Sequence, residues 1–446
     1  MNTDRFIIKF NAAGEYQQTM DAIAAEVLLR IYVNDDFLTE LSCTPQDLRE
    51  LVIGYLYVNG WANSQEQQGV PFDIYKMEDG VYTAKLNISL NREARGLTQI
   101  GAACQDGETD KRAVYVMSCM DALLHASKAF EETGCIHAAG LFRMYGEDET
   151  AEAVGQPEAV MKPQFLGEDI SRYYALYKAV GSAVIAGADL SKFYLCTTGR
   201  LPVGYMERVI RTGIPCVISR SAPTDAALSL AEKYGVLVYG FANGKRVNLY
   251  PTLTGCAVLA GGMATRIGGV DKSRLTYQGK TFLSQIQGQL PVTMPQYLSY
   301  NRNPEDIRQY CERAVIVPDG IGQIGPLGGL EALLRRAGND GCVRLLLVAC
   351  DMPLYNRSIT ETLLQEADDH TDITVFRTGD GRVQTLCGMY RISCLPVIEQ
   401  MIEEKCYKLQ ALLDRVRTRY LQTNPYQLSD EWFRNVNTPE DYPCEK

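Results

Sequence analysis

A short stretch rich in glycine and basic side chains follows an apolar run in the second half of the chain. Residues 259–275 read LAGGMATRIGGVDKSRL and overlap the end of the apolar run 256–260. Glycine lets backbone N–H groups cradle phosphate oxygens, while Arg266 and Lys272 could neutralise the charge on a departing pyrophosphate. The stretch fits neither G-x-x-x-x-G-K-[ST] nor G-x-G-x-x-G, and a tight turn with exposed basic residues remains an alternative.

A carboxylate stands at the end of a second apolar run. Residues 344–349, apolar throughout after Arg344, predict a strand in the middle of a sheet, and the sequence ACDMP follows at 349–353. Ligands of open α/β sheets bind at the carboxyl ends of strands, where the glycine-rich loop is also expected. Asp351 at this position suits Mg²⁺, although an aspartate there can also be a turn or cap residue.

Two α/β patterns run in series and divide at about residues 250–255. The first pattern predicts a hairpin of 27–33 and 37–42, a helix capped by Thr44, strands at 192–196, 214–219 and 236–241, and a helix at 224–234. The second predicts strands at 256–260, 296–300, 314–318 and 344–349, and helices at 281–290, 305–313 and 329–337. This alternation favours an α/β fold whose second half contains a mostly parallel sheet covered on both faces.

Composition limits the classes of function. A chain of 446 residues favours two or three domains, and a formal net charge of −10 disfavours nonspecific nucleic-acid binding. Without a signal-like or membrane-spanning apolar segment, the sequence predicts a cytoplasmic protein with no membrane partner. The 14 cysteines include no C-x-x-C pair and the 3 histidines are far apart, so zinc and iron–sulfur sites are not expected.

The second half resembles the molybdenum cofactor guanylyltransferase (MobA) family. The resemblance rests on the loop, Asp319, GPLGGL at 325–330, ACDMP and NVNTPEDY at 435–442, in the order and spacing of the family along 256–446. It implies a Rossmann-like nucleotidyltransferase fold and transfer of GMP from GTP to the phosphate of Mo-molybdopterin. A cytidylyltransferase or a sugar-phosphate nucleotidyltransferase is the alternative, and Gly261 stands where cytidylyltransferases usually carry a second alanine.

The MobA resemblance also implies roles for single residues. The nucleotide would be held by Leu259, Ala260, Gly261 and Gly262, and its phosphates would be contacted by Lys272, with Arg266 as a second catalytic cation. Guanosine recognition would involve Asn301 and Asp319, and Mg²⁺ would be held by Asp351.

The first half resembles the formate dehydrogenase accessory sulfurtransferase (FdhD) family. The motifs are CTPQDLRELVIGYLYVNG, TGCIHAAG, EDISRYYALYKAVG, TTGR and SRSAPTDAALSLAE, in that order. The resemblance implies a cytidine-deaminase-like domain at 1–250, ahead of a guanylyltransferase domain at 251–446. It implies binding of molybdopterin guanine dinucleotide and transfer of sulfur to it from a cysteine desulfurase. A molybdenum-insertion protein and a molybdoenzyme client such as formate dehydrogenase are the expected partners.

Several family positions are kept in the first half and others are changed. Residues expected to contact the cofactor are His137, Arg172, Lys178, Arg200 and Arg220. Where the family reads T-G-G-x-H the chain has Cys135, and a family histidine, asparagine and aspartate are Tyr173, Tyr174 and Tyr177.

The loop IGAACQDGETDKR offers Cys104 as the persulfide carrier, with Cys119 and Cys135 as the next candidates. Because of the changed positions, a non-catalytic cofactor-binding or docking module is the alternative for this half.

Overall fold

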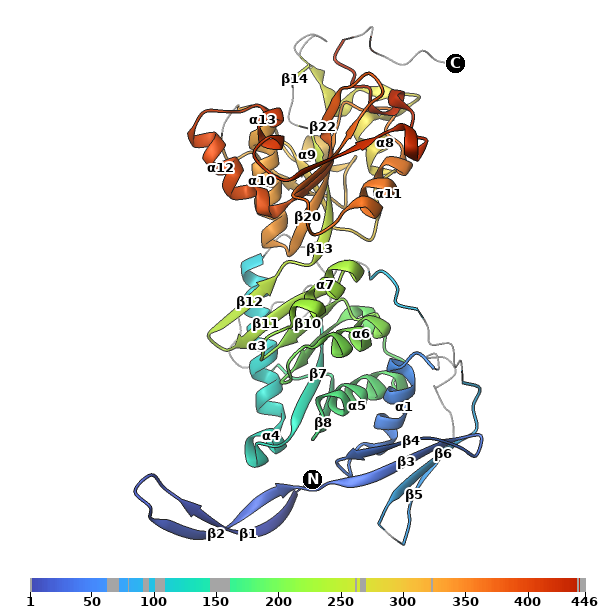
Figure 1. The fold of residues 1–446 in the computed structure, drawn as a ribbon, viewed down its shortest axis with the longest axis vertical. Coiled ribbons are helices and arrows are strands. Elements are labelled where there is room, and N and C mark those ends of the chain that lie inside the picture. Colours follow the sequence, from blue (N-terminus) through green and yellow to red (C-terminus); the bar gives the residue numbers. More distant parts are fainter. Residues whose placement is uncertain are drawn as a thin grey trace. The chain divides into compact units, whose positions relative to one another are not determined.

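The computed structural model describes the chain except for residues 1, 62–71, 79, 91–95, 101–108, 145–160, 261–262, 265–269, 322–323, 439–440 and 442–446. The chain separates into two compact units, and their main division falls between Tyr250 and Pro251 (Figure 1). Among the described helices, none combines the length and apolar character needed to cross a membrane.

The first unit begins with a two-stranded hairpin and a four-stranded sheet. Strands β1 (Asn2–Phe10) and β2 (Tyr16–Ala24) form a two-stranded hairpin that the sequence reading did not anticipate. Next comes a four-stranded sheet in the order β4-β3-β6-β5, from β3 (Val27–Val33), β4 (Asp36–Cys43), β5 (Asp73–Lys76) and β6 (Tyr82–Leu86). The hairpin expected at 27–42 is confirmed, and Asn34 and Asp35 form its turn with φ values of 52° and 63°.

A six-stranded mixed sheet forms the centre of the first unit. Its order is β12-β11-β10-β9-β7-β8, built from β7 (His137–Arg143), β8 (Phe165–Asp169), β9 (Phe193–Thr197), β10 (Cys216–Ser219), β11 (Leu237–Asn243) and β12 (Arg246–Tyr250). The strands expected at 192–196, 214–219 and 236–241 are confirmed as β9, β10 and β11, and the structure shows that they run parallel to one another. Their carboxyl ends therefore lie at one edge of the sheet.

Helices cover both faces of this sheet. They are α1 (Leu48–Val58), α3 (Thr109–Ala126), α4 (Lys128–Thr133), α5 (Arg172–Ile185), α6 (Val203–Thr212) and α7 (Asp225–Tyr234). Phe193 and Leu195 share a core with residues of α1, α5 and α6. Tyr194, which alternates with them, contacts Tyr115 of α3. The 224–234 helix is confirmed, and the Thr224 side chain accepts a hydrogen bond from the Ala227 N–H as its cap.

Helices α1 and α5 pack almost backbone to backbone (Figure 1). A Cβ on Gly54 would lie 1.8 Å from the carbonyl oxygen of Tyr177, and one on Gly181 would lie 2.0 Å from that of Glu50. Helix α1 begins at Leu48 behind Asp47, so the expected cap by Thr44 is wrong. Thr44 is instead fully buried, and its hydroxyl lies 3.1 Å from Asp169 Oδ2.

The second unit is a seven-stranded sheet in the order β19-β18-β13-β20-β22-β21-β23. The strands are β13 (Leu253–Leu259), β18 (Gln296–Ser299), β19 (Val315–Val317), β20 (Cys342–Ala349), β21 (Ile373–Arg377), β22 (Val383–Arg391) and β23 (Thr418–Gln422). Only β22 runs against its neighbours, and β20 is buried along its whole length in the middle of the sheet. The expected α/β class, the mostly parallel sheet and the central strand are confirmed.

The larger helices of this unit flank the sheet (Figure 1). They include α8 (Phe282–Gln287), α9 (Glu305–Arg308), α10 (Pro326–Asn339), α11 (Arg357–Glu366), α12 (Leu395–Glu403) and α13 (Leu409–Leu413). Helix α9 ends sooner than its apolar pattern suggested. Helix α10 starts 3 residues earlier than expected, because Pro326 occupies the first turn, where its missing N–H costs nothing.

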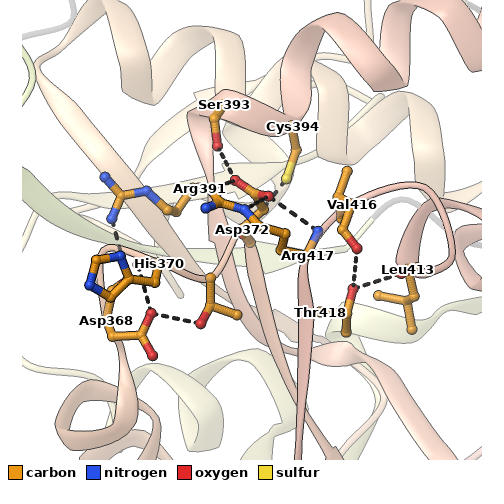
Figure 2. Close-up of polar contacts among 11 residues, drawn as sticks. Asp368, His370, Asp372, Arg391, Ser393, Cys394, Leu413, Val416, Arg417 and Thr418 are labelled. Carbon is orange, nitrogen blue, oxygen red and sulfur yellow. Dashed lines mark hydrogen bonds and ion pairs between the residues drawn. The ribbon is translucent and has the colours of Figure 1, made fainter.

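A network of ion pairs closes the edge of the sheet where the parallel strands begin (Figure 2). Asp372, just before β21, accepts hydrogen bonds from Ser393 Oγ at 2.9 Å and from Arg417 Nε at 3.0 Å. Asp369 pairs with both Arg344 and Arg391, at 3.0 and 3.1 Å. Ion pairs hold the segments at this end of the sheet together. The carboxyl ends of the parallel strands lie at the opposite end.

Candidate functional sites

At the carboxyl edge of the second sheet, a lysine, a carboxylate and an amide meet. Asp351 follows the end of β20, and Lys272 lies in a short 3₁₀ turn beyond the glycine-rich loop. The Lys272 Nζ lies 2.9 Å from Asp351 Oδ2 and 2.6 Å from Asn437 Oδ1. The Val436 N–H donates to the Asp351 backbone carbonyl at 2.8 Å, which fixes the 435–438 segment beside the strand end. The structure thus brings together Lys272, Asp351 and the conspicuous NVNTPEDY segment.

Asp351 keeps one carboxylate oxygen without a protein partner. Its Oδ1 is buried and has no hydrogen-bond partner among the described residues. A buried oxygen in that state is costly unless a ligand satisfies it. Mg²⁺ usually takes one or two oxygen ligands from the protein, completed by substrate phosphates and water, and Asp351 and Asn437 carry oxygens that could serve as such ligands.

Asp319 lies two residues beyond the edge strand β19 and is fixed by hydrogen bonds. Its Oδ1 accepts from Ser299 Oγ at 2.8 Å and its Oδ2 accepts from Asn301 Nδ2 at 2.8 Å, while its own N–H donates to Asn301 Oδ1 at 2.7 Å. The reciprocal Asn301–Asp319 pair fixes both side chains. Each carboxylate oxygen retains lone pairs for a ligand donor.

These groups line a cavity of about 160 Å³. Its lining includes Leu259, Lys272, Ser299, Asp319, Gly325, Pro326, Gly329 and Asp351. The first turn of α10 forms one wall, and a helix N-terminus favours an anion. Gly329 permits this close approach, since a Cβ there would lie 2.6 Å from Leu259 Cδ2 and 2.9 Å from Ser299 Oγ.

A second, more polar cavity of about 660 Å³ shares Asn437 with this cluster. It is lined by Asp380, Arg382, Gln384, Asp430, Glu431, Arg434, Asn435 and Asp441, among others. The lining of this cavity therefore contains both carboxylates and guanidiniums. Asn437 therefore contacts Lys272, which lines the first cavity, and itself lines the second cavity, between β22 and the C-terminal segment.

Some expected residues cannot be placed. Arg266, Gly261, Gly262 and Cys104 lie outside the described residues. Ala260 is described, and its N–H donates to the Ser299 carbonyl at 3.1 Å, so it supports the cavity wall through its backbone. Asn437 and Ser299 were not singled out from the sequence, although NVNTPEDY had drawn attention as a segment.

In the first unit, predicted cofactor residues gather at the carboxyl edge of the central strands. His137 starts β7, and its Nδ1 lies 3.4 Å from Thr198 Oγ1, just past β9. Arg200 follows on the same loop and Arg220 follows β10. Arg172 opens α5 and lies across Gly199, where a Cβ would be 2.9 Å from Arg172 Cβ.

This cluster is strongly cationic. Arg172, Arg200 and Arg220 have no carboxylate within ion-pair distance among the described residues. Burial and then the charges of Arg172 and Arg200 lower the pKa of His137 below its ordinary value. Burial and these charges favour the neutral imidazole. Three guanidiniums without a carboxylate partner among the described residues, on a chain of net charge −10, suit an anionic ligand.

Lys178 stands apart from that cluster. It is 0% exposed, and its Nζ lies 2.8 Å from Asp169 Oδ2, 2.6 Å from Thr44 Oγ1 and 3.1 Å from the Glu168 carbonyl. These acceptors occupy the ammonium group in the core between α1, α5 and β8. The placement argues against direct contact with a phosphate and favours a structural role.

The altered positions form an aromatic cluster with Arg208. Tyr177 accepts a hydrogen bond from Arg208 Nε at 2.6 Å, and the Arg208 guanidinium carbon lies 4.9 Å from the Tyr173 ring centre. Of the two cysteine candidates that are described, Cys119 is buried and Cys135 is exposed. Of these two thiols, only that of Cys135 is exposed to solvent.

Comparison with known proteins assigns each half to a family. The FdhD/NarQ family model matches residues 24–254, and the model of the MobA-like NTP transferase domain matches residues 256–420. The "Sulfur carrier protein FdhD" of Listeria monocytogenes is 27% identical over 263 residues, covering 53% of this chain and 92% of that protein. The "Molybdenum cofactor guanylyltransferase" of Vibrio vulnificus is 32% identical over 195 residues, covering 43% of this chain and 95% of that protein.

A solved structure, "Molybdopterin-guanine dinucleotide biosynthesis protein A" from Archaeoglobus fulgidus, aligns with 42% of this chain and 94% of its own at 22% identity and a TM-score of 0.36. The family matches and the two compact units define a two-domain α/β protein whose halves come from separate families. The chain belongs to the FdhD/NarQ family through its first half and continues as a MobA-like NTP transferase domain, so it is a fusion of the two.

Proposed function

We propose that residues 251–446 transfer GMP from GTP to Mo-molybdopterin, giving molybdopterin guanine dinucleotide and pyrophosphate. The contact of Lys272 with Asp351 and Asn437 beside the cavity is the observation that carries this proposal. It joins a cation for phosphates and oxygen ligands for a metal beside a cavity at the carboxyl ends of the strands. The family match supplies the substrate class.

The proposed chemistry needs positioning more than acid–base catalysis. The acceptor phosphate is already a nucleophile, so no general base is required. Lys272 stabilises the negative charge that develops on the α-phosphate and on the leaving pyrophosphate. Asp351 and Asn437 would hold Mg²⁺, which supplies further charge neutralisation when bound. The N-terminus of α10 adds its favourable dipole from the facing wall.

Asp319 is proposed to select guanine. The N1–H and the amino group of guanine are adjacent donors, which a carboxylate can accept, and cytosine offers no such pair. Ser299 and Asn301 keep the Asp319 carboxylate oriented and thereby reduce the entropy lost on binding. This proposal favours GTP over the CTP of the cytidylyltransferase alternative.

The cavity of about 660 Å³ is proposed to receive the acceptor. Its carboxylates, Asp380 and Asp430 among them, suit the N–H groups of a pterin, and its arginines suit a phosphate. Asn437 would then stand between the two substrates.

The first half is proposed to bind the dinucleotide product and pass sulfur to it. The cluster of Arg172, Arg200 and Arg220 would hold the phosphates, and Cys104 would receive sulfur from a cysteine desulfurase as a persulfide. The client is a molybdoenzyme such as formate dehydrogenase. The changed positions 135, 173, 174 and 177 keep a non-catalytic cofactor-binding module as the second candidate.

Two substitutions test the guanylyltransferase proposal. Asp351→Asn and Lys272→Ala should each lower turnover about 10²–10³-fold at saturating GTP and Mg²⁺, the scale expected when one charge-stabilising group is removed. Asp414→Asn and Lys280→Ala, at exposed positions of the same unit, serve as matched controls. Near-normal turnover of both active-site variants would exclude these roles.

Cysteine substitution separates the two candidates for the first half. Cys104→Ala should abolish persulfide loading by a desulfurase while guanylyl transfer stays unchanged, because the two reactions use different domains. Persulfide retained on the variant would contradict the choice of thiol. A wild-type chain that never accepts sulfur would establish the non-catalytic module.

A further inference from the structure

The Lys272 ammonium group contacts both side-chain oxygens that are proposed to hold Mg²⁺. Its Nζ lies 2.9 Å from Asp351 Oδ2 and 2.6 Å from Asn437 Oδ1. The same lysine is also proposed to bind the phosphates of GTP. An ammonium group has three donors, and these two contacts leave only one of them for a phosphate. Lys272 therefore cannot serve the phosphates fully while it keeps both partners.

The ion pair is largely shielded from solvent. The side chain of Lys272 is 15% exposed and that of Asp351 is 13% exposed. Solvent and salt screen such a pair much less than a surface pair. A divalent ion at the same oxygens would be repelled by the nearby ammonium charge. The lysine and a divalent ion therefore compete for Asp351 and Asn437.

The second oxygen of Asp351 does not remove this competition. Its Oδ1 is buried and has no hydrogen-bond partner among the described residues, so it offers a metal ion one ligand beside the ammonium charge. Mg²⁺ usually combines one or two carboxylates with substrate phosphates. A divalent ion alone is therefore expected to bind weakly. Phosphates would both add ligands for the ion and give the ammonium group another anion.

Only the side chain of Lys272 has to move for such an exchange. Ser273, in the 3₁₀ turn Lys272–Arg274, is fully buried. The Leu275 N–H donates to the Lys272 carbonyl at 3.3 Å, and the Phe282 N–H donates to the Leu275 carbonyl at 2.8 Å. The backbone is thus held in place, whereas a lysine side chain is a flexible four-carbon stem. Lys272 itself lines the cavity of about 160 Å³, so an anion bound there lies beside it.

We propose that Lys272 is an exchangeable counter-ion for Asp351 and Asn437. Before the nucleotide binds, the lysine neutralises Asp351 and keeps divalent ions away from it. The phosphates of GTP then take over the ammonium group, and the released oxygens bind the divalent ion that accompanies the nucleotide. GTP and the metal ion thus bind together. The proposal rests on the proposed guanylyltransferase function for its nucleotide, but its test uses a metal ion alone.

Binding of Mn²⁺ without nucleotide, followed by the EPR signal of the free ion, tests the proposal. Lys272→Met keeps the stem and removes the competing charge, so it should bind Mn²⁺ about 5–150-fold more tightly than the wild type, the range typical of coupled sites. Lys272→Gln should show a gain as well, because its amide can donate to Asp351 without a charge. Lys280→Met, at an exposed position of the same unit, changes the net charge equally and should leave the affinity unchanged. No gain in either Lys272 variant, or an equal gain in Lys280→Met, overturns the proposal.

A double substitution locates the bound ion. Lys272→Met combined with Asp351→Asn should bind Mn²⁺ no more tightly than the wild type, because the carboxylate ligand is gone. Tight binding retained by the double variant contradicts the proposal, since the ion would then lie elsewhere. Guanylyl transfer by the wild type is measured separately. Tighter Mn²⁺ binding by Lys272→Met in a chain that makes no guanine dinucleotide would support the exchange and contradict the guanylyltransferase proposal.

Discussion

Replacing Lys178 with methionine distinguishes a structural lysine from a ligand-binding one. The substitution keeps the volume of the stem and removes the charge, which leaves the Asp169 carboxylate buried at 0% exposure without its counter-ion. Breaking a buried pair in this way costs about 3–5 kcal/mol. At about 2–4 °C per kcal/mol for a domain of this size, the first unit should melt about 6–20 °C earlier.

The two tryptophans make the measurement specific to one unit. Trp61 belongs to the first unit and Trp432 to the second, so urea unfolding followed by fluorescence in a Trp432→Phe background reports on the first alone. Lys128→Met, at an exposed position of α4, is the matched control and should change stability by less than about 0.5 kcal/mol. Unchanged stability of Lys178→Met together with loss of cofactor binding would refute the reasoning.

A double substitution isolates the charge. Asp169→Asn combined with Lys178→Met removes both charges and keeps an amide oxygen for the Ser171 N–H, which now donates to Asp169 Oδ1 at 3.1 Å. Most of the lost stability should return, because the penalty arises from an unpaired charge. A double variant as unstable as the single one would mean that packing, and not charge, sets the effect.

Three further outcomes follow from the second unit. Asn437→Ala should lower kcat while leaving the free energy of unfolding within about 0.5 kcal/mol of the wild type, and wild-type kinetics would remove Asn437 from the site. Gly329→Val should raise the KM for GTP more than it lowers kcat, because the side chain enters the cavity; an unchanged KM would contradict the placement of the nucleotide. The hydrogen bonds from Arg417 hold the pKa of Asp372 below its ordinary value, so this carboxylate stabilises the unit above its unfolded pKa and the contribution is lost as the pH falls through its folded pKa. Asp372→Asn should therefore be less stable at pH 7 and converge with the wild type in acid, as followed by Trp432 fluorescence; parallel pH curves would exclude this contribution.

The sequence was most informative where local pattern and burial agree. The run 344–349, apolar from Leu345 onward, became the central strand β20, and Thr224 capped its helix as expected. A strand buried on both faces carries a nearly continuous apolar pattern, which is easy to recognise. Asp351 could be placed at the strand end for the same reason.

The local sequence pattern did not reveal contacts between segments that are far apart in the sequence. Lys178 looked like a phosphate ligand because it is a lysine in a cofactor motif, yet its ammonium group contacts Asp169 and also Thr44, which lies 134 residues away in sequence. Thr44 precedes a proline and resembled a helix cap, but its hydroxyl instead contacts the side chains of Asp169 and Lys178. The alternation of Phe6, Ile8 and Phe10 was available in the sequence and predicts a strand with one apolar face.

The buried Thr44–Asp169–Lys178 contact also has a consequence during synthesis on the ribosome. Its partners are 125 and 134 residues apart, so α1 cannot be covered by α5 until the later segment has emerged. At about 5–20 residues per second, this delay is roughly 7–27 s. Leu51, Val52 and Leu56, which are fully buried in the finished fold, are without that cover meanwhile. The first unit is therefore expected to depend on chaperones during translation until α5 has emerged.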